Sequence, residues 1–362
     1  MKVLIAPNAF KGTITAFEAG EIIADELAKN YPDDIFDLVP IADGGDGTCT
    51  LLSKSLGIPP TKVWSLDPFG KPVLGEYFLD KEKAYLDVSS VSGLGLIAAG
   101  ELDARTASTC GTGLLINHAI SSGAKEIILG LGGSATVDLG IGILQALGLH
   151  FLDEKGREIP PFSPDLLFRI KHIQRSPSIP SVKFNFLCDV RNYFFGEEGA
   201  IPIFGPQKGL KSQDFEEFEN QSKFLLDQLY SKKKRVFEDQ EGFGAAGGIA
   251  AGLSSVFEST INMGALFFFK EIGMEEKVKR ADLIITGEGK YDQQSKSGKA
   301  CYELMNLAKS FQKSVMIVTS GNEAAGEGFS RVLQLPDLDF ESADFKNQAR
   351  KNLRSLISKL EL

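Results

Sequence analysis

Residues 1–27, MKVLIAPNAFKGTITAFEAGEIIADEL, combine the patterns of a strand and a helix in one short unit. The apolar residues 3–6 predict a buried strand that ends at Pro7. A helix is expected from Thr15, whose hydroxyl can cap it together with Glu18 three residues later. A strand followed by a polar loop and a helix is typical of α/β proteins.

The same order of patterns recurs along the chain. A second strand is expected at 36–41, followed by the glycine loop ADGGDGT at 42–48 and a helix that contains Leu51 and Leu52. Further strands are expected at 126–129, 184–187, 283–286 and 315–319, and further helices at 112–121 and from Lys299. Short strands rich in Val and Ile that alternate with helices predict parallel sheets.

The stretch 62–90 does not show this order of strands and helices. Its alternation of apolar and polar residues, broken by turns, predicts antiparallel hairpins. We therefore expect an α/β fold of two α/β domains. A parallel-sheet, Rossmann- or flavodoxin-like domain would be built from both termini, residues 1–65 and 280–362. Residues 66–279 would form the second, inserted α/β domain. The cleft between the two domains is the expected place for a small-molecule site.

Charge and composition argue against several classes of function. The 362 residues carry a net charge of −9, and the basic residues are spread among the acidic ones, which argues against nucleic-acid binding. The opening apolar run is too short for a signal peptide, and no segment has the ~18 apolar residues of a membrane span, so a cytoplasmic protein is expected. The four cysteines lack CxxC spacing, and none of the three histidines lies beside a nucleophile motif.

The strand expected at 126–129 leads into the glycine loop GLGGSAT at 130–136. Backbone N–H groups in such a loop, aimed by a helix N-terminus, can bind an anion. The loop also satisfies the dinucleotide fingerprint GxGxxA, with Asp153 about twenty residues later. An NAD-dependent hydroxy-acid dehydrogenase is therefore one alternative. No GxxxxGK[ST] loop occurs, which excludes a P-loop enzyme.

Charged residues follow other strands at positions where parallel sheets collect ligands. The candidates are the loop acids Asp43, Asp46, Asp189, Glu288 and Asp292 and the lysines beside glycine, Lys11, Lys208 and Lys299. Phosphoryl transfer needs carboxylates that hold Mg²⁺, cations that hold phosphate, and a base near the accepting hydroxyl. The combination favours a phosphotransferase.

Six blocks then follow one another over nearly the whole chain. They are NAFKGTITAFEA, PIADGGDGT, IILGLGGSATVDLGIGILQALG, FGPQKG, GAAGGIAAGL and ITGEGKYDQQSKSGK. In content and order these blocks resemble those of the type-one bacterial glycerate kinases. The resemblance implies phosphorylation of D-glycerate that depends on ATP and Mg²⁺ and gives 2-phosphoglycerate, with the site between two α/β domains.

In this interpretation ATP and D-glycerate meet in the cleft between the domains. Gly132, Gly133 and Ser134 would cradle phosphate through backbone donors and the Ser134 hydroxyl. Asp189 would act as the base, or would orient the metal, near the acceptor hydroxyl. Lys11 and Lys208 would neutralise phosphate or the substrate carboxylate, and Asp43 would act in catalysis together with Asp189 and Lys11. Gly287 and Glu288 would bind the nucleotide. Mg²⁺ would be bound by one or two of Asp43, Glu288 and Asp292.

The chain departs from the family pattern at four positions: Asp46, Val137, Leu139 and Ser295. Asp46 and Ser295 keep the chemical type of the usual residue. Val137 removes an amide, and Leu139 occupies a glycine position. These two changes leave open a second alternative, a catalytically silent relative that binds glycerate or nucleotide.

Overall fold

The computed structural model describes residues 1–10, 12–98 and 100–362. The described chain forms two compact units. Unit 1 consists of Met1–Asp43 together with Met263–Leu362, and unit 2 consists of Gly44–Asn262. Among the described residues, none of the helices combines the length and the apolar character that crossing a membrane requires.

The bounds of the units differ from the domain bounds expected from sequence, which were 1–65 with 280–362 around 66–279. Residues 44–65 lie in unit 2 because α2 (Thr48–Ser55) packs on β5 (Lys83–Asp87) and β6 (Glu126–Gly130). Residues 263–279 lie in unit 1, where α10 (Gly264–Glu271) and α11 (Met274–Arg280) pack on α12 (Ala300–Ser310). Side-chain packing at these junctions, which no local pattern reports, sets the bounds.

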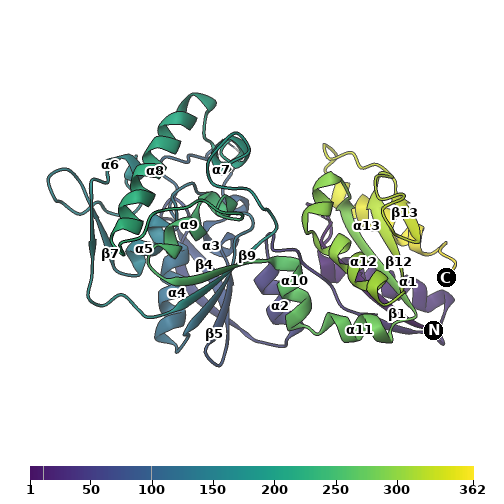
Figure 1. Ribbon diagram of the computed structural model, residues 1–362. Coiled ribbons are helices and arrows are strands. Elements are labelled where there is room, and N and C mark those ends of the chain that lie inside the picture. Colours follow the sequence, from purple (N-terminus) through teal and green to yellow (C-terminus); the bar gives the residue numbers. More distant parts are fainter. Residues whose placement is uncertain (11, 99) are drawn as a thin grey trace. The chain divides into compact units, whose positions relative to one another are not determined.

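Unit 1 is built on a five-stranded parallel sheet (Figure 1). Its strands are β1 (Lys2–Pro7), β2 (Ile35–Leu38), β11 (Leu283–Lys290), β12 (Ser314–Ser320) and β13 (Arg331–Leu335). They lie in the order β13-β12-β11-β1-β2, and every neighbouring pair is parallel. Counted along unit 1, this is the flavodoxin-like order 2-1-3-4-5, whose ligand crevice opens between the carboxyl ends of the first and third strands. The expected parallel α/β fold is confirmed.

Helices cover both faces of this sheet. They are α1 (Ala16–Asn30), α10 (Gly264–Glu271), α11 (Met274–Arg280), α12 (Ala300–Ser310) and α13 (Phe345–Ile357), with the 3₁₀ turn η5 (Gln293–Ser297). The α1 and α13 helices share one core with Val3, Ile5 and Ile285. Because side chains alternate along a strand, Leu4 and Ile284 point to the opposite face, where α11 and α12 pack. The predicted cap of α1 is confirmed, since the Glu18 N–H donates to the Thr15 hydroxyl at 3.2 Å.

Unit 2 contains a six-stranded sheet in the order β10-β9-β6-β5-β4-β3. Its strands are β3 (Pro60–Leu66), β4 (Pro72–Asp80), β5, β6, β9 (Lys183–Cys188) and β10 (Glu258–Met263). The β5, β6 and β9 strands are mutually parallel, whereas β3, β4 and β5 form the antiparallel hairpins expected at 62–90. A separate antiparallel pair joins β7 (Leu149–Leu152) to β8 (His172–Arg175).

The helices of unit 2 vary widely in length. The α-helices are α2, α3 (Ser89–Ser92), α4 (Cys110–Ser121), α5 (Ile141–Ala146), α6 (Leu166–Arg169), α7 (Ala200–Phe204), α8 (Phe215–Ser231) and α9 (Ile249–Ser254). The 3₁₀ turns are η1 (Leu94–Leu96), η2 (Pro206–Lys208), η3 (Ser212–Asp214) and η4 (Ala245–Gly247). The α4 helix packs on β3 at such short range that a Cβ added to Gly111 would lie 1.8 Å from the Leu66 carbonyl oxygen.

We predict that Gly111→Ala lowers the free energy of unfolding by about 1–3 kcal/mol, because the new methyl group must push α4 away from a strand backbone. The matched control is Gly95→Ala, since Gly95 is exposed and an added Cβ there meets no atom within 4 Å. The measurement is urea unfolding followed by circular dichroism. Equal stability of the two variants would contradict the close approach.

Candidate functional site

The first group of polar residues lies at the carboxyl ends of the unit 1 strands. Asn8 follows β1, and its backbone N–H donates to the Gly287 carbonyl of β11 at 2.8 Å. The Asn8 side-chain amide donates to Asp43 Oδ2 at 3.1 Å. Both side chains are buried, with exposed fractions of 8% and 4%. The group therefore lies at the strand-order switch point, where this sheet type binds ligands.

Glu288 is the buried acid of this group. Burial raises the pKa of its carboxyl to about 7; Lys299 opposes the shift, whereas Asp43 and Asp292 add to it. Its Oε1 atom has no hydrogen-bond partner among the described residues. A buried carboxylate oxygen without a donor is costly unless a ligand or cation satisfies it.

Lys299 is the cation of the group. It is the N-cap residue of α12, and its ammonium lies 3.8 Å from Asp292 Oδ1. Ser295 holds the preceding turn, because the Asp292 N–H donates to its hydroxyl at 3.1 Å. A helix N-terminus with an adjacent lysine attracts anions.

These residues line a pocket of about 450 Å³ that lies within unit 1. Asn8, Asp43, Glu288 and Lys299 form its polar part. Its other wall is apolar and comes from the loops after β1 and β13 and from α13. This volume is in the usual range for small-molecule sites.

The second group of polar residues follows the parallel strands of unit 2. The register places Asp87, Gly130 and Leu187 side by side at the ends of β5, β6 and β9. The loop after β6 is anchored at both ends, since the Leu131 N–H donates to Leu187 and the Ala135 N–H donates to Ser92. The predicted phosphate-cradling loop is therefore held at one end by β9 and at the other by the last residue of α3.

Close backbone approaches bring three predicted loops together in unit 2. A Cβ on Gly132 would lie 2.2 Å from the Asp46 nitrogen. A Cβ on Gly44 would lie 2.4 Å from the Cys188 carbonyl oxygen, next to the half-buried Asp189. Only glycine fits at these two crossings. Asp46, the glycine loop and Asp189 thus share one edge of the sheet.

Lys208 lies beneath the glycine loop and is 3% exposed. Its ammonium donates to the Ser134 hydroxyl at 2.8 Å and to the Thr136 carbonyl at 2.9 Å. Burial lowers the pKa of Lys208 to about 7, and the negative charge of Asp138 partly offsets this effect. An anion bound at Ser134 would favour the protonated form of Lys208.

Sequence reasoning missed two buried acids in unit 2. Asp138 accepts hydrogen bonds from the N–H groups of Thr109, Gly140 and Gly142, and burial raises its pKa. Asp87 accepts from the N–H groups at the start of α2, and burial raises its pKa to about 6. Asp138 lies within a glycine-rich block, a signal that could have identified it. Asp87 lies in a hairpin segment and carried no comparable signal.

The structure also bears on the remaining sequence candidates. Leu139, at the position where the resemblance suggests glycine, adopts φ 54°, a left-handed backbone that glycine adopts more readily. Lys11 lies outside the described residues. No group of three or more His, Cys, Asp or Glu side chains arranged to hold a metal ion occurs in the described part of the chain.

The dinucleotide fingerprint lacks its structural context. β7, the strand before Asp153, pairs antiparallel with β8 in a separate sheet, rather than extending the parallel sheet of β6. The Asp153 carboxylate is bound to Arg157 at 2.9 Å, which together with backbone donors lowers its pKa to about 2. The fingerprint requires a βαβ unit with a free acid, so this loop does not support a dinucleotide site.

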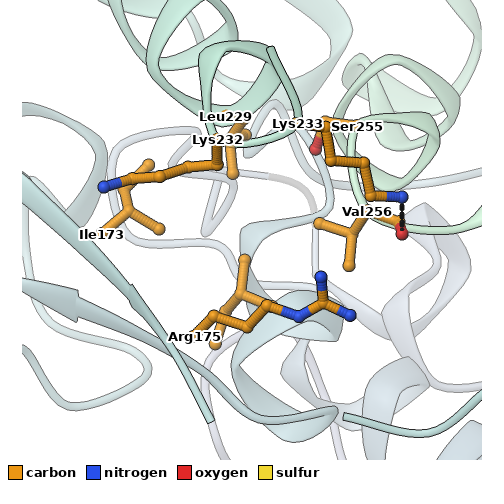
Figure 2. A pocket seen from close by; sticks show the side chains of 8 residues that line it. Ile173, Arg175, Leu229, Lys232, Lys233, Ser255 and Val256 are labelled. Carbon is orange, nitrogen blue, oxygen red and sulfur yellow. Dashed lines mark hydrogen bonds between the residues drawn. The ribbon is translucent and has the colours of Figure 1, made fainter. Parts of the chain in front are cut away.

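A smaller pocket of about 160 Å³ in unit 2 is lined by Arg175, Lys232, Lys233 and apolar side chains (Figure 2). The Lys233 ammonium donates to the Val256 carbonyl. The nearby Arg235 donates to the Ser254 carbonyl at 2.7 Å. Ser254 is the last residue of α9, and Val256 lies just beyond it. Cations commonly bind the carbonyl end of a helix. Lys233 and Arg235, two of the four consecutive basic residues 232–235, therefore cap the end of α9.

Comparison with known proteins finds relatives along the whole chain. A model of the glycerate kinase family matches residues 3–361. The glycerate kinase of Halalkalibacterium halodurans is 34% identical over 336 residues, which cover 92% of this chain and 88% of that protein. The glycerate 2-kinase of Escherichia coli K12 is 34% identical over 321 residues, which cover 87% of this chain and 84% of that protein. A crystal structure from Salmonella typhimurium LT2, provisionally named glycerate kinase 2, matches with a TM-score of 0.84 and 29% identity over 99% of this chain and 96% of that chain.

We predict that the buried amine of Lys208 makes folding stability depend on pH. Its pKa is about 7 in the folded chain and 10.5 in the reference state, so between these values the unfolded chain binds more protons. Stability relative to Lys208→Met should therefore rise as pH increases from about 7 to 10. The measurement is thermal unfolding across this range, with the exposed Lys211→Met as the control. A pH-independent difference between wild type and Lys208→Met would show that Lys208 keeps its ordinary pKa.

Proposed function

Because the chain belongs to the glycerate kinase family, we propose that it transfers the terminal phosphoryl group of ATP to a hydroxyl of D-glycerate. The resemblance seen in the six sequence blocks is confirmed. The structural observation that carries the proposal is the acidic group with Lys299 at the switch point of unit 1. A kinase needs such groups to hold the metal and the phosphates of its donor.

The acceptor position follows from the relatives. The Escherichia coli protein is named a glycerate 2-kinase. We extend this regiochemistry to the present chain, so the product would be 2-phosphoglycerate. Because the proposed reaction uses ATP, which is available in the cytoplasm, we propose that the protein acts there.

The acids of unit 1 fit a Mg²⁺ ion. Asp43, Glu288 and Asp292 are close enough that the charges of the other two raise the pKa of Glu288. Mg²⁺ usually takes one or two carboxylates and completes its coordination with water and phosphate oxygens. Glu288 is proposed as a ligand because its Oε1 atom is buried without a donor among the described residues, and Asp43 because its charge acts on Glu288 more strongly than that of Asp292. When bound there, Mg²⁺ would offset negative charge on the transferring phosphoryl group.

The glycine loop of unit 2 is proposed to hold an anionic group of substrate or donor. Gly132, Gly133 and Ser134 would donate through their backbone and hydroxyl groups. Lys208 would gain a proton as the anion arrives, since its pKa of about 7 leaves it partly neutral beforehand. The protonated fraction of Lys208 would therefore be larger when the anion is bound.

Asp189 is proposed as the base. Asp189 follows β9, and its backbone nitrogen lies beside the loop that contains Gly44. The glycerate hydroxyl oxygen would bond to the γ-phosphorus as the bond from that phosphorus to the β–γ bridging oxygen breaks. ADP would leave, and the hydroxyl proton would pass to Asp189. In a loose transition state, orienting the hydroxyl contributes as much as removing its proton.

We predict that the purified chain releases ADP from ATP only when both D-glycerate and a divalent metal are present. A coupled assay that follows ADP, with NMR identification of the phosphorylated carbon, measures this. 3-Hydroxypropanoate, which lacks the hydroxyl on carbon 2, serves as the acceptor control. Binding of D-glycerate without ADP release at saturating Mg²⁺ would instead identify a silent relative.

We predict that Asp189→Asn keeps the fold and lowers kcat by about 10²–10⁴-fold, because the amide cannot accept the proton or carry the charge. The affinity for ATP should change little. The matched control is Asp227→Asn, an exposed residue of α8. Steady-state kinetics and nucleotide titration of both variants separate an effect on turnover from an effect on ATP binding. A kcat close to that of wild type would remove Asp189 from the catalytic residues.

A further inference from the structure

The unit 1 pocket has an apolar wall that the proposed chemistry has not used. This wall comes from Phe10, Ile14, Leu335, Leu338 and Phe340. Phe10 and Ile14 are buried and belong to the core shared by α1 and α13. The wall is therefore the open edge of a packed core, and its position is set by that core.

The wall does not suit the acceptor. A three-carbon hydroxy acid is polar on every side and much smaller than the 450 Å³ of the pocket. A nucleoside phosphate matches the pocket better, because its base has apolar faces while its ribose and phosphates are polar. The polar residues at the end of β11 and the apolar residues after β13 lie two strands apart in the sheet, about 10 Å at ordinary strand spacing.

We propose that this apolar wall binds the base of the phosphoryl donor, so that unit 1 holds the nucleoside and Phe340 forms the surface on which the base stacks. The inference rests on the proposed function for the identity of the donor. It assigns a role to the loop after β13, which the sequence did not single out.

Phe340 has the properties of a stacking platform. Its side chain is 65% exposed, although it lines the pocket. Its ring lies 5.8 Å from that of Phe345, the first residue of α13, which supports it from one side. An exposed aromatic ring at the mouth of a pocket gains contact area when a planar base covers it.

Polar groups beside the wall can bind the edges of a nucleoside. Asn352 lines the pocket from α13, and its Oδ1 accepts from Gln348 at 2.7 Å, which orients the amide. Asp337 lines the pocket next to Leu338 and can accept from ribose hydroxyls. Few oriented polar groups within an apolar wall are typical of small-molecule sites.

The test compares ADP binding by the full-length chain and its Phe340→Ala variant, using titration calorimetry with Mg²⁺ present. Loss of a stacked base should weaken ADP binding about 5- to 100-fold. Phe340→Trp should bind ADP within about threefold of wild type, because it keeps the aromatic surface. The matched control is Phe224→Ala, which removes a ring of 43% exposure from α8 in unit 2 and should leave ADP binding unchanged.

Inorganic tripolyphosphate is the second probe, because it carries the phosphates without a base. Its affinity should be the same in wild type and Phe340→Ala, as should the KM for D-glycerate. The inference is overturned if ADP does not bind the wild-type chain or if Phe340→Ala binds ADP as tightly as wild type. It is also overturned if Phe340→Ala lowers the affinity for ADP and the affinity for tripolyphosphate by the same factor.

The two proposals can fail separately. If ADP binding depends on Phe340 but the chain does not phosphorylate D-glycerate, the proposed acceptor is wrong and the proposed nucleoside site still stands. Turnover of D-glycerate with ATP, together with an unchanged KM for ATP in Phe340→Ala, would keep the function and refute the nucleoside site.

Discussion

The parallel pairing of β1 with β11 is the constraint on which the rest of unit 1 depends. It joins residues 280 positions apart, as in the hydrogen bond that the Thr286 hydroxyl donates to the Ala6 carbonyl. Closing so long a loop costs conformational entropy, which the buried strands and the core between α1 and α13 offset. The same pairing places Asn8 beside Gly287 and so brings Asp43 and Glu288 to one crevice.

Each unit contains a buried ionisable group whose pKa is shifted toward neutrality by burial. In unit 1 the pKa of Glu288 is raised to about 7, and in unit 2 the pKa of Lys208 is lowered to about 7. Both groups cost stability in the charged form, because water is replaced by protein. Such shifts concentrate at functional sites, where a cation or an anion restores the charge. The raised pKa of Glu288 fits a cation bound in unit 1, and the lowered pKa of Lys208 fits an anion bound in unit 2.

Much of the local structure could be predicted because it depends on local patterns. Apolar runs marked the central strands, and Thr15 marked the start of α1. The acids Asp43 and Glu288 were identified because they follow strands in glycine-rich loops. Asp87 was missed because its partners, the N–H groups of Cys49 and Thr50, are far away in sequence. The wall that includes Phe340 was missed because its residues come from three separate segments.

The sequence by itself determined the α/β class, the family and the loops that carry charge, since these are encoded by periodicity and by contiguous motifs. The tertiary structure alone decided the strand order, the bounds of the two units and the neighbours of each buried acid. It also decided that β7 pairs with β8, which removes the structural context of the dinucleotide fingerprint. These features arise from packing between distant segments, and a pKa such as that of Lys208 follows from burial that only the folded chain creates.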